Sequence, residues 1–345
     1  MAQETSGLDA LGWGSFFASQ TDAETLARTP AARVVSVDRN GLHVLGVGID
    51  LRIPPRTDVT VGDWLLLDLA MSRAHRLLTR KSLLKRRAPG SDRQLQLIAA
   101  NLDTVFVVTS CNQDFNIARL ERYVALAFEA GIQPVIILTK ADLVPDPSAL
   151  IETAGRISER VPVVALDARG EEPAARLSPW CRPGQTVAFL GSSGVGKSTL
   201  SNALAGTDLI ATQAIREDDA KGRHTTTRRA LYQIPGGCMV VDTPGMRELQ
   251  LVDAATGIAD TFEDMVALSA QCRFPDCRHE SEPGCAVREA IQRGQIDAAR
   301  LKRWRKLLAE NRVNSESLAQ RRARERAFGK MVRTVIKSKG PRGRA

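Results

Sequence analysis

The stretch GSSGVGKST at 191–199 has the residue types and spacing of a loop that binds phosphate groups. Its glycines let the backbone curl, so that several N–H groups point at phosphate oxygens. Lys197 would reach the β- and γ-phosphates, and the Ser198 hydroxyl would bind Mg²⁺ at the start of a helix. The sequence therefore predicts a nucleoside triphosphate site with Mg²⁺. The residues expected to surround the phosphates are Gly191, Ser192, Ser193, Gly194, Val195, Gly196, Lys197, Ser198 and Thr199.

A second motif, TKAD at 139–142, has the form of a guanine reader. The Asp142 carboxylate would accept hydrogen bonds from the guanine N1–H and exocyclic amine, while the stem of Lys140 packs over the base. Adenine presents the wrong donor pattern to that carboxylate. The motif also ends an apolar strand, where α/β domains bind ligands, so we expect GTP. The residues placed at the base are Thr139, Lys140, Ala141 and Asp142.

The guanine motif precedes the phosphate loop along the chain, which reverses the order of ordinary GTPases. Only the positions of the two motifs in space matter to the ligand. A parallel sheet can be cut in one loop and rejoined at its old ends, because the ends of a domain often lie close together. The motif order therefore predicts a circularly permuted GTPase domain.

Two further segments, KGRHTTTRR and DTPG, carry groups suited to Mg²⁺ and the γ-phosphate. Asp242 follows the apolar strand CMVV, and its carboxylate would hold Mg²⁺ through water. The Gly245 amide would meet the γ-phosphate. Either Thr225 or Thr226 would bind Mg²⁺ from a switch segment, and the alternative is a polar surface loop.

The group that would act on the attacking water is less direct to identify. Met246 follows DTPG, where many GTPases place a glutamine that orients the water. Another residue must help, or turnover is slow. His224 would orient or deprotonate the water from the switch segment, and the alternative is an exposed loop histidine with no catalytic role.

The segment CRFPDCRHESEPGC carries a set of metal ligands. Three thiolates and one imidazole complete a tetrahedral shell for Zn²⁺ and leave no open position for water. One structural zinc ion is therefore expected. Its ligands would be Cys272, Cys277, His279 and Cys285.

The elements that must position these motifs follow from the apolar pattern. Beyond Gln94, continuous apolar runs such as DTVFVVTS and QPVIILTK predict buried parallel strands, and the helical run between them ends at Gly131. This pattern is typical of an α/β nucleotide domain. After about Asp253 the chain is predicted to form helices around the cysteines, followed by a cationic tail.

The N-terminal part is predicted to be different in kind. From Ala32 to about Arg80, short alternating runs include ARVVSVD, an Asn40-Gly41 turn, LHVLGVGI and VGDWLLLD. These predict a small closed β-barrel of the OB type, with a generic all-β module as the alternative. The basic run RKSLLKRRAPGSDR after it is interpreted as a linker, which would equally suit contact with phosphates.

Composition limits the class of partner. The chain has 345 residues and a net charge of +9, and clustered Lys and Arg gain free energy by displacing counterions from a polyanion. Nucleic acid is the leading candidate. No apolar run approaches the roughly 18 residues of a membrane span, and the start lacks a secretory pattern. We expect a cytoplasmic protein with no membrane partner, and a monomer.

Together these motifs resemble the ribosome small subunit-dependent GTPase A (RsgA) family over nearly the whole chain. The resemblance rests on VGDW, NLDTVFVVTS, TKADL, GSSGVGKSTL, GRHTTT, DTPGMRE and the Cys-Cys-His-Cys cluster. It implies an OB-fold, a permuted GTPase domain and a helical zinc-binding domain. It also implies GTP hydrolysis stimulated by the small ribosomal subunit and its rRNA during late maturation of that subunit.

Two positions depart from the family pattern. Thr139 stands where the family usually has Asn, so an amide that braces the phosphate loop becomes a single hydroxyl, and guanine affinity is expected to be weaker. The segment VVALDARGEE at 163–172 occupies the place of the loop that backs the guanine but lacks its usual serine. Backbone amides are expected to serve there.

The predicted architecture is an OB-fold β-barrel, a circularly permuted P-loop GTPase α/β domain and an α-helical zinc-binding domain. The alternative functions are a GTP-responsive RNA-binding regulator with negligible hydrolysis, and an ATP-dependent kinase or transporter ATPase. The predicted ranges are 1–30 for an N-terminal extension, 31–90 for the OB-fold, 91–252 for the GTPase domain, 253–315 for the zinc-binding domain and 316–345 for a basic tail.

Overall fold

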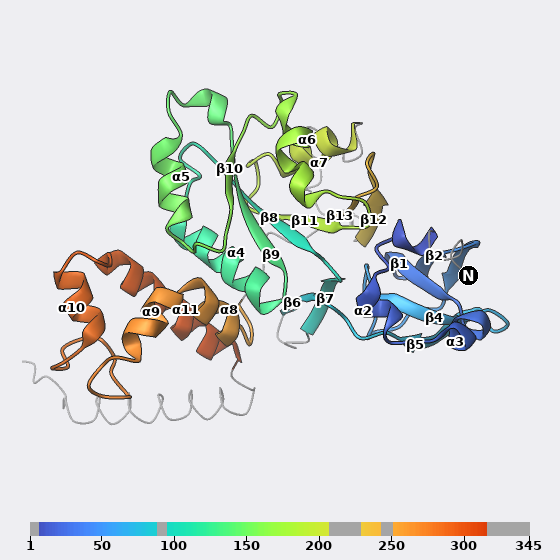
Figure 1. Cartoon of the computed structure of the whole chain (residues 1–345), viewed down its shortest axis with the longest axis horizontal. Helices are drawn as coiled ribbons and strands as arrows, with labels where there is room; N and C mark the ends of the chain where they lie inside the picture. Colours follow the sequence, from blue (N-terminus) through green and yellow to red (C-terminus); the bar gives the residue numbers. More distant parts are fainter. Residues whose placement is uncertain (1–6, 88–94, 207–228, 243–250, 316–345) are drawn as a thin grey trace, which may run out of the picture.

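The computed structural model describes residues 7–87, 95–206, 229–242 and 251–315. A central sheet flanked by helices lies between a group of N-terminal strands on one side and a group of helices on the other (Figure 1). We refer to these parts as the central sheet, the N-terminal strands and the C-terminal helices.

In the described part of the chain, five parallel strands form the central sheet, in the order β10-β9-β8-β11-β13. They are β8 (Thr104–Ser110), β9 (Gln133–Thr139), β10 (Val163–Ala165), β11 (Thr186–Leu190) and β13 (Met239–Asp242). Every residue of β8 is buried, as its continuous apolar run predicts for a strand covered on both faces. The chain builds outward from β8 to β10 and then returns to place β11 on the other side of β8. The carboxyl ends of β9 and β11 therefore lie on either side of the β8 end, at a switch point of the topology.

Helices cover both faces of this sheet. They are α4 (Ile117–Glu129), α5 (Ser148–Gly155), α6 (Glu172–Leu177) and α7 (Lys197–Ala205), with short 3₁₀ turns η1 (Ala141–Leu143) and η2 (Ser178–Trp180). Asn116 caps α4, because its side chain accepts the Arg119 amide at 3.0 Å. The predicted helix end is confirmed, since α4 stops at Glu129 and Gly131 has a φ of +72°.

The N-terminal strands pair antiparallel in the order β3-β2-β1-β4-β5. They are β1 (Ala31–Asp38), β2 (Gly41–Gly46), β3 (Ile49–Ile53), β4 (Trp64–Asp68) and β5 (Arg73–Leu77). The prediction of one strand over LHVLGVGI is wrong, because a turn at Gly48, with a φ of +65°, splits it into β2 and β3. Among the described residues no pairing joins β3 to β5, so the closure expected of a barrel is absent from the strand ladder.

The N-terminal strands continue into the central sheet. Strand β12 (Arg229–Gln233) pairs antiparallel with β13 on one side and with β1 on the other, where Val37 lies opposite Arg229. The linker interpretation of 80–93 is also wrong in part, because β6 (Leu83–Arg87) pairs with β7 (Leu95–Ala100). Backbone hydrogen bonds between these two consecutive strands outweigh the polar character of this run.

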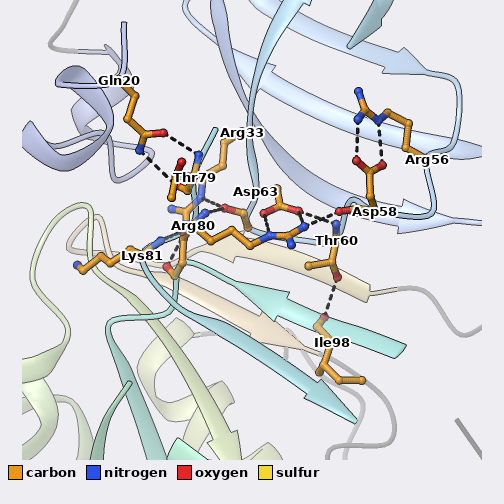
Figure 2. Close-up of polar contacts among 12 residues, drawn as sticks. Gln20, Arg33, Arg56, Asp58, Thr60, Asp63, Thr79, Arg80, Lys81 and Ile98 are labelled. Carbon is orange, nitrogen blue, oxygen red and sulfur yellow. Dashed lines mark hydrogen bonds and ion pairs between the residues drawn. The ribbon is translucent and has the colours of Figure 1, made fainter. Parts of the chain in front are cut away.

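We call the contact between the N-terminal strands and the central sheet the N-terminal junction. Arg33 lies at this junction and stabilises it (Figure 2). Its side chain is buried, and its guanidinium donates to Thr186 Oγ1 at 2.8 Å and to the Asn101 carbonyl at 3.3 Å. It also donates to the carbonyls of Gly62, at 3.4 Å, and of Leu11. One cation therefore joins the N-terminal segment, β1, the turn before β4, the turn after β7 and the start of β11.

A second polar group lies beside it (Figure 2). Arg80 donates to both oxygens of the fully buried Asp63 carboxylate, at 2.7 and 2.8 Å. The same carboxylate accepts the Thr60 amide, and the Thr60 hydroxyl reaches the Ile98 carbonyl at 3.1 Å. Burial raises the pKa of Asp63, against the effect of Arg80. The turn before β4 is thus tied both to the N-terminal strands and to β7.

The predicted N-terminal extension packs onto the strands from residue 8 onward. It includes α2 (Ser15–Ala18) and α3 (Ala23–Arg28). The rings of Trp13 and Phe17 lie 4.8 and 5.8 Å from the buried Trp64 ring. This aromatic cluster covers one face of β4.

The C-terminal helices are α8 (Ala255–Thr261), α9 (Glu263–Ser269), α10 (Ala286–Gln292) and α11 (Ala298–Ser315). Their buried side chains include Ile258, Phe262, Met265 and Trp304, which join the core beneath α4. Within the described ranges, none of the helices has the length and apolar character needed to span a membrane.

Candidate nucleotide site and metal centre

The phosphate loop connects β11 to α7, as its motif predicts. Gly191 has a φ of +150°, and a Cβ there would lie 2.3 Å from the Val108 carbonyl oxygen, so no larger residue fits. Gly194 and Gly196 have φ values of +77° and +94°. The Lys197 ammonium donates to the Gly191 carbonyl at 2.8 Å and to that of Ser192. Helix α7 begins at Lys197 itself, so this cation lies at the N-terminus of the helix.

The TKAD motif follows β9 and turns sharply. Lys140 adopts the left-handed conformation, with a φ of +56°, and η1 begins at the next residue. The fully buried Thr139 hydroxyl lies 2.7 Å from the Val195 carbonyl and 3.1 Å from that of Thr109. A hydroxyl has one proton, so it donates to one of these oxygens at a time. Thr139 thus lies against the phosphate loop from the guanine motif.

One cavity of about 480 Å³ joins the two motifs. Lys140 and Asp142 line one part of its wall, and the phosphate loop with the first turn of α7 lines another. The complete lining is Asn112, Thr139, Lys140, Asp142, Leu143, Asp167, Ala168, Arg169, Gly194, Gly196, Lys197, Ser198 and Thr199. The predicted residues Ala141, Gly191, Ser192, Ser193 and Val195 belong to the same loops but are not part of this lining.

The segment after β10 contributes Asp167, Ala168 and Arg169 to the wall. The Asp167 carboxylate accepts the Arg169 amide at 2.9 Å, which fixes the turn. The Leu166 carbonyl accepts the Ala141 amide at 3.4 Å, which ties this turn to the guanine motif. The sequence indicated this segment through its place in the family pattern. Asn112 was missed, although it follows the carboxyl end of β8, where ligand-binding residues gather.

Part of the predicted site lies outside the described residues. These residues are His224, Thr225, Thr226 and Gly245. Asp242 ends β13 and its backbone pairs with Ala230, but its side chain also lies outside the description. The predictions for these five residues therefore stay predictions.

The four predicted zinc ligands come together between α9 and α10, with ligand atoms within 4.8 Å of one another. Cys272 Sγ lies 4.0 Å from Cys285 Sγ, and the two sulfurs lie 3.6 and 3.4 Å from His279 Nδ1. Tetrahedral zinc, with bonds of about 2.3 Å to sulfur and about 2.0 Å to nitrogen, requires separations of about 3.8 and 3.5 Å. The cluster can therefore hold a metal ion of this size.

Chemistry around the cluster also suits a metal. The Ser269 hydroxyl lies 3.2 Å from His279 Nε2, which fixes the ring with Nδ1 toward the sulfurs. Burial lowers the pKa of His279 and favours the neutral, metal-binding imidazole. Burial would raise the pKa of Cys272, but amides at the start of α10, those of Val287 and Ala286, help to hold it below its usual value. These two shifts favour the protonation state that binds metal, whereas burial raises the pKa of the Cys277 thiol to about 11.

Known proteins are similar to this chain in sequence and in fold. The family model for the RsgA GTPase matches residues 77–252. The chain is 46% identical over 335 residues to the small ribosomal subunit biogenesis GTPase RsgA 2 of Vibrio vulnificus (strain CMCP6), covering 96% of each protein. It is 50% identical over 313 residues to the small ribosomal subunit biogenesis GTPase RsgA of Mesorhizobium japonicum, covering 88% of this chain and 90% of that protein.

Two solved structures are similar. YjeQ from Thermotoga maritima has a TM-score of 0.61 at 26% identity, covering 81% of this chain and 97% of that one. YloQ, described as a circularly permuted GTPase, has a TM-score of 0.58 at 21% identity, covering 86% and 100%. The predicted permutation of the fold is therefore confirmed.

Proposed function

Because the chain belongs to the RsgA GTPase family, we propose that its cavity between 139–142 and 191–199 binds GTP and is the site of hydrolysis. The chain is a GTP-hydrolysing enzyme. The observation that supports this location is that Asp142 and Lys197 line one cavity although they are distant in sequence. Water attacks the γ-phosphate, and GDP and phosphate leave.

Each part of the cavity has a task in this proposal. Asp142 accepts the guanine N1–H and amine, and the stem of Lys140 covers the base. Residues 191–199 direct amides at the phosphates, and Lys197 neutralises the β- and γ-oxygens. Thr139 holds the phosphate loop in register with the guanine motif through the Val195 carbonyl. Fixed donors of this kind stabilise the charge that develops during hydrolysis.

The chain offers suitable groups for Mg²⁺ and for the attacking water. The Ser198 hydroxyl, one of Thr225 and Thr226, and the Asp242 carboxylate would hold the ion. Mg²⁺ held by these residues would neutralise negative charge on the phosphates. His224 orients the water or takes its proton.

The cluster of Cys272, Cys277, His279 and Cys285 holds one structural Zn²⁺ in this proposal. Its four protein ligands leave no position for water, so the ion supplies stability and no chemistry. The ring of His279 lies 5.7 Å from that of Trp304, and thereby connects the cluster to α11.

The proposed partner is the small ribosomal subunit, which the relatives' names assign to those proteins. The net charge of +9 suits contact with rRNA. We assign an OB-type module to 31–90, the GTPase domain to 91–252, the zinc-binding helices to 253–315 and a basic tail to 316–345, with the N-terminal extension at 1–30. The protein acts as a monomer in the cytoplasm, on maturing small subunits.

GTP turnover with and without small subunits tests this proposal. Turnover should rise at least tenfold with purified small subunits and stay at its basal rate with large subunits, the matched control. A lack of stimulation at every salt concentration would exclude the ribosomal role. Single-turnover cleavage with and without RNA separates the enzyme from the regulator that hydrolyses no GTP.

The location of the base needs its own experiment. Asp142→Asn should weaken GTP binding by about 1–3 kcal/mol, because an acceptor in the cavity wall becomes a donor that faces the guanine N1–H. Competition of GTP, XTP and ATP for the site measures this. Asp146→Asn, a change of the same type beyond the cavity, is the control. Unchanged nucleotide preference in Asp142→Asn would place the base elsewhere.

A further inference from the structure

Helix α4 lies between the phosphate loop and the C-terminal helices, and one side chain from its first turn reaches the loop. Arg119 Nη1 donates to the Ser192 hydroxyl at 2.5 Å. The Arg119 backbone is fixed at the same time, because its amide donates to the Asn116 side chain at 3.0 Å. Neither Arg119 nor Ser192 lines the cavity, so this contact reaches the phosphate loop outside the cavity wall.

The opposite side of α4 carries the anchor of the C-terminal helices. Positions 119 and 121 lie about 200° apart around a helix. The fully buried Glu121 carboxylate accepts Arg303 Nε, at 2.8 and 3.0 Å from its two oxygens, and Arg300 at 3.4 Å. Arg300 also forms two hydrogen bonds of 2.8 Å with Asp264. The side chains of Arg300 and Arg303 in α11 thus pair with one carboxylate of α4, that of Glu121.

Close backbone packing continues this contact along α4. A Cβ at Gly257 of α8 would lie 2.0 Å from the Ala125 carbonyl oxygen, so the two helices touch without intervening side chains. The Gly257 amide donates to the Glu129 carboxylate at 2.9 Å. Arg122 pairs with Glu310 of α11. We call the contacts of Glu121, Arg122, Ala125 and Glu129 with α8 and α11 the C-terminal junction.

We propose that Arg119 is a positioning residue for the phosphate loop, and that α4 couples the nucleotide in the cavity to the C-terminal helices. A shift of Ser192 on phosphate binding pulls Arg119, and the well-packed helix α4 carries the shift to Glu121 and its two arginines. Such coupling is reciprocal, so a partner that displaces α11 changes the affinity for GTP by the same factor. This inference rests on the proposed GTP site.

Removal of either end of the contact tests the coupling. Arg119→Gln keeps a polar side chain but loses the cation, and Ser192→Ala removes the acceptor. Each change should weaken binding of a non-hydrolysable GTP analogue by about threefold to tenfold. The double variant should lose no more affinity for the analogue than the more affected single variant, because the two changes remove the same interaction. Arg28→Gln, at an exposed pair on α3, is the control with wild-type affinity.

Amide hydrogen exchange of the full chain provides a second readout. When the variants are compared at equal occupancy of the site, weaker binding of the analogue does not by itself change the exchange rates. With saturating analogue in place of GDP, exchange of α8 and α11 amides should change about fivefold in the unmodified chain and in Arg28→Gln. In Arg119→Gln and Ser192→Ala this difference should disappear at equal occupancy of the site.

The outcomes separate two failures. A chain that binds no GTP would overturn the proposed function and the coupling together. A chain that binds GTP, but whose α8 and α11 amides respond equally with and without Arg119, or not at all, would overturn the coupling alone. Additive losses of affinity in the double variant would show that Arg119 and Ser192 act separately, and would also overturn it.

Discussion

The central sheet holds its two neighbours by different means. At the N-terminal junction, β1 and β12 extend one hydrogen-bonded sheet, and the buried Arg33 joins five segments. At the C-terminal junction, helices pack side by side and ion pairs of Glu121 and Arg122 connect them. The first contact depends on main-chain pairing, and the second on the packing of α4 against α8 and α11 and on their side-chain ion pairs.

This difference decides which neighbour can move. Separating β1 from β12 would expose backbone donors and acceptors and leave the partners of Arg33 unpaired, which is costly. Burial lowers the pKa of Arg33 to about 10, so it stays charged at neutral pH and needs those partners. Packed helices can instead shift by small distances while their ion pairs follow. We therefore expect the N-terminal strands to be the more fixed neighbour of the central sheet and the C-terminal helices the more adjustable one.

Removal of the proposed Zn²⁺ should have the largest effect, and only on the C-terminal side. Structural zinc contributes on the order of 10 kcal/mol of apparent binding energy, which is lost on chelation. Amides of 272–285 and α10 should exchange much faster, whereas those of β1 and β12 stay protected. Exchange measured by mass spectrometry, with zinc content by atomic emission, tests this. Re-addition of Zn²⁺ is the control. An equal loss of protection in β1 would contradict the expectation that the two junctions respond separately.

Arg33→Met should be the most damaging single replacement at the N-terminal junction. It removes one donor from each of four acceptors, of which the Gly62 carbonyl keeps the Asn101 side-chain amide at 2.9 Å. The expected cost is about 3–5 kcal/mol in the free energy of unfolding. Urea denaturation measures the loss. Arg52→Met removes an exposed arginine of β3, paired with Asp38, and should cost under about 1 kcal/mol. Similar losses in the two variants would contradict the role of Arg33.

Glu121→Gln should loosen the C-terminal junction alone. Arg303 loses its close ionic partner, while Arg300 keeps Asp264, so the expected loss is about 2–3 kcal/mol. Amides of α11 should exchange faster, with β8 and β1 unchanged. If protection fell evenly over the whole chain, the two junctions would not be independent.

Arg122→Gln should have the smallest effect. The Arg122 and Glu310 side chains are 34% and 24% exposed, so water and salt screen their pair, and its loss should cost under about 1 kcal/mol. Urea denaturation at low and high salt measures it. The wild-type advantage should vanish in 1 M NaCl, and a larger, salt-independent loss would assign Arg122 a packing role.

The local motifs were predictable because each depends on a few neighbouring residues. The glycines of 191–199 adopt the backbone conformations that the motif requires, and Cys272, Cys277, His279 and Cys285 converge as their spacing predicts. The buried strands β8 and β9 followed from continuous apolar runs. Errors occurred where the local signal was ambiguous. The run at 42–49 was divided by a turn, and part of the basic run at 80–93 formed β6.

The sequence by itself determined the type of chemistry, since the phosphate loop, the guanine motif and the metal ligands are defined by residue type and spacing. Only the tertiary structure decided how the parts connect. The pairing of β1 with β12, the burial of Arg33 and the contact of Arg119 with Ser192 join residues far apart in the chain. An edge strand or an arginine has many acceptable partners, and the packing of the whole fold selects among them.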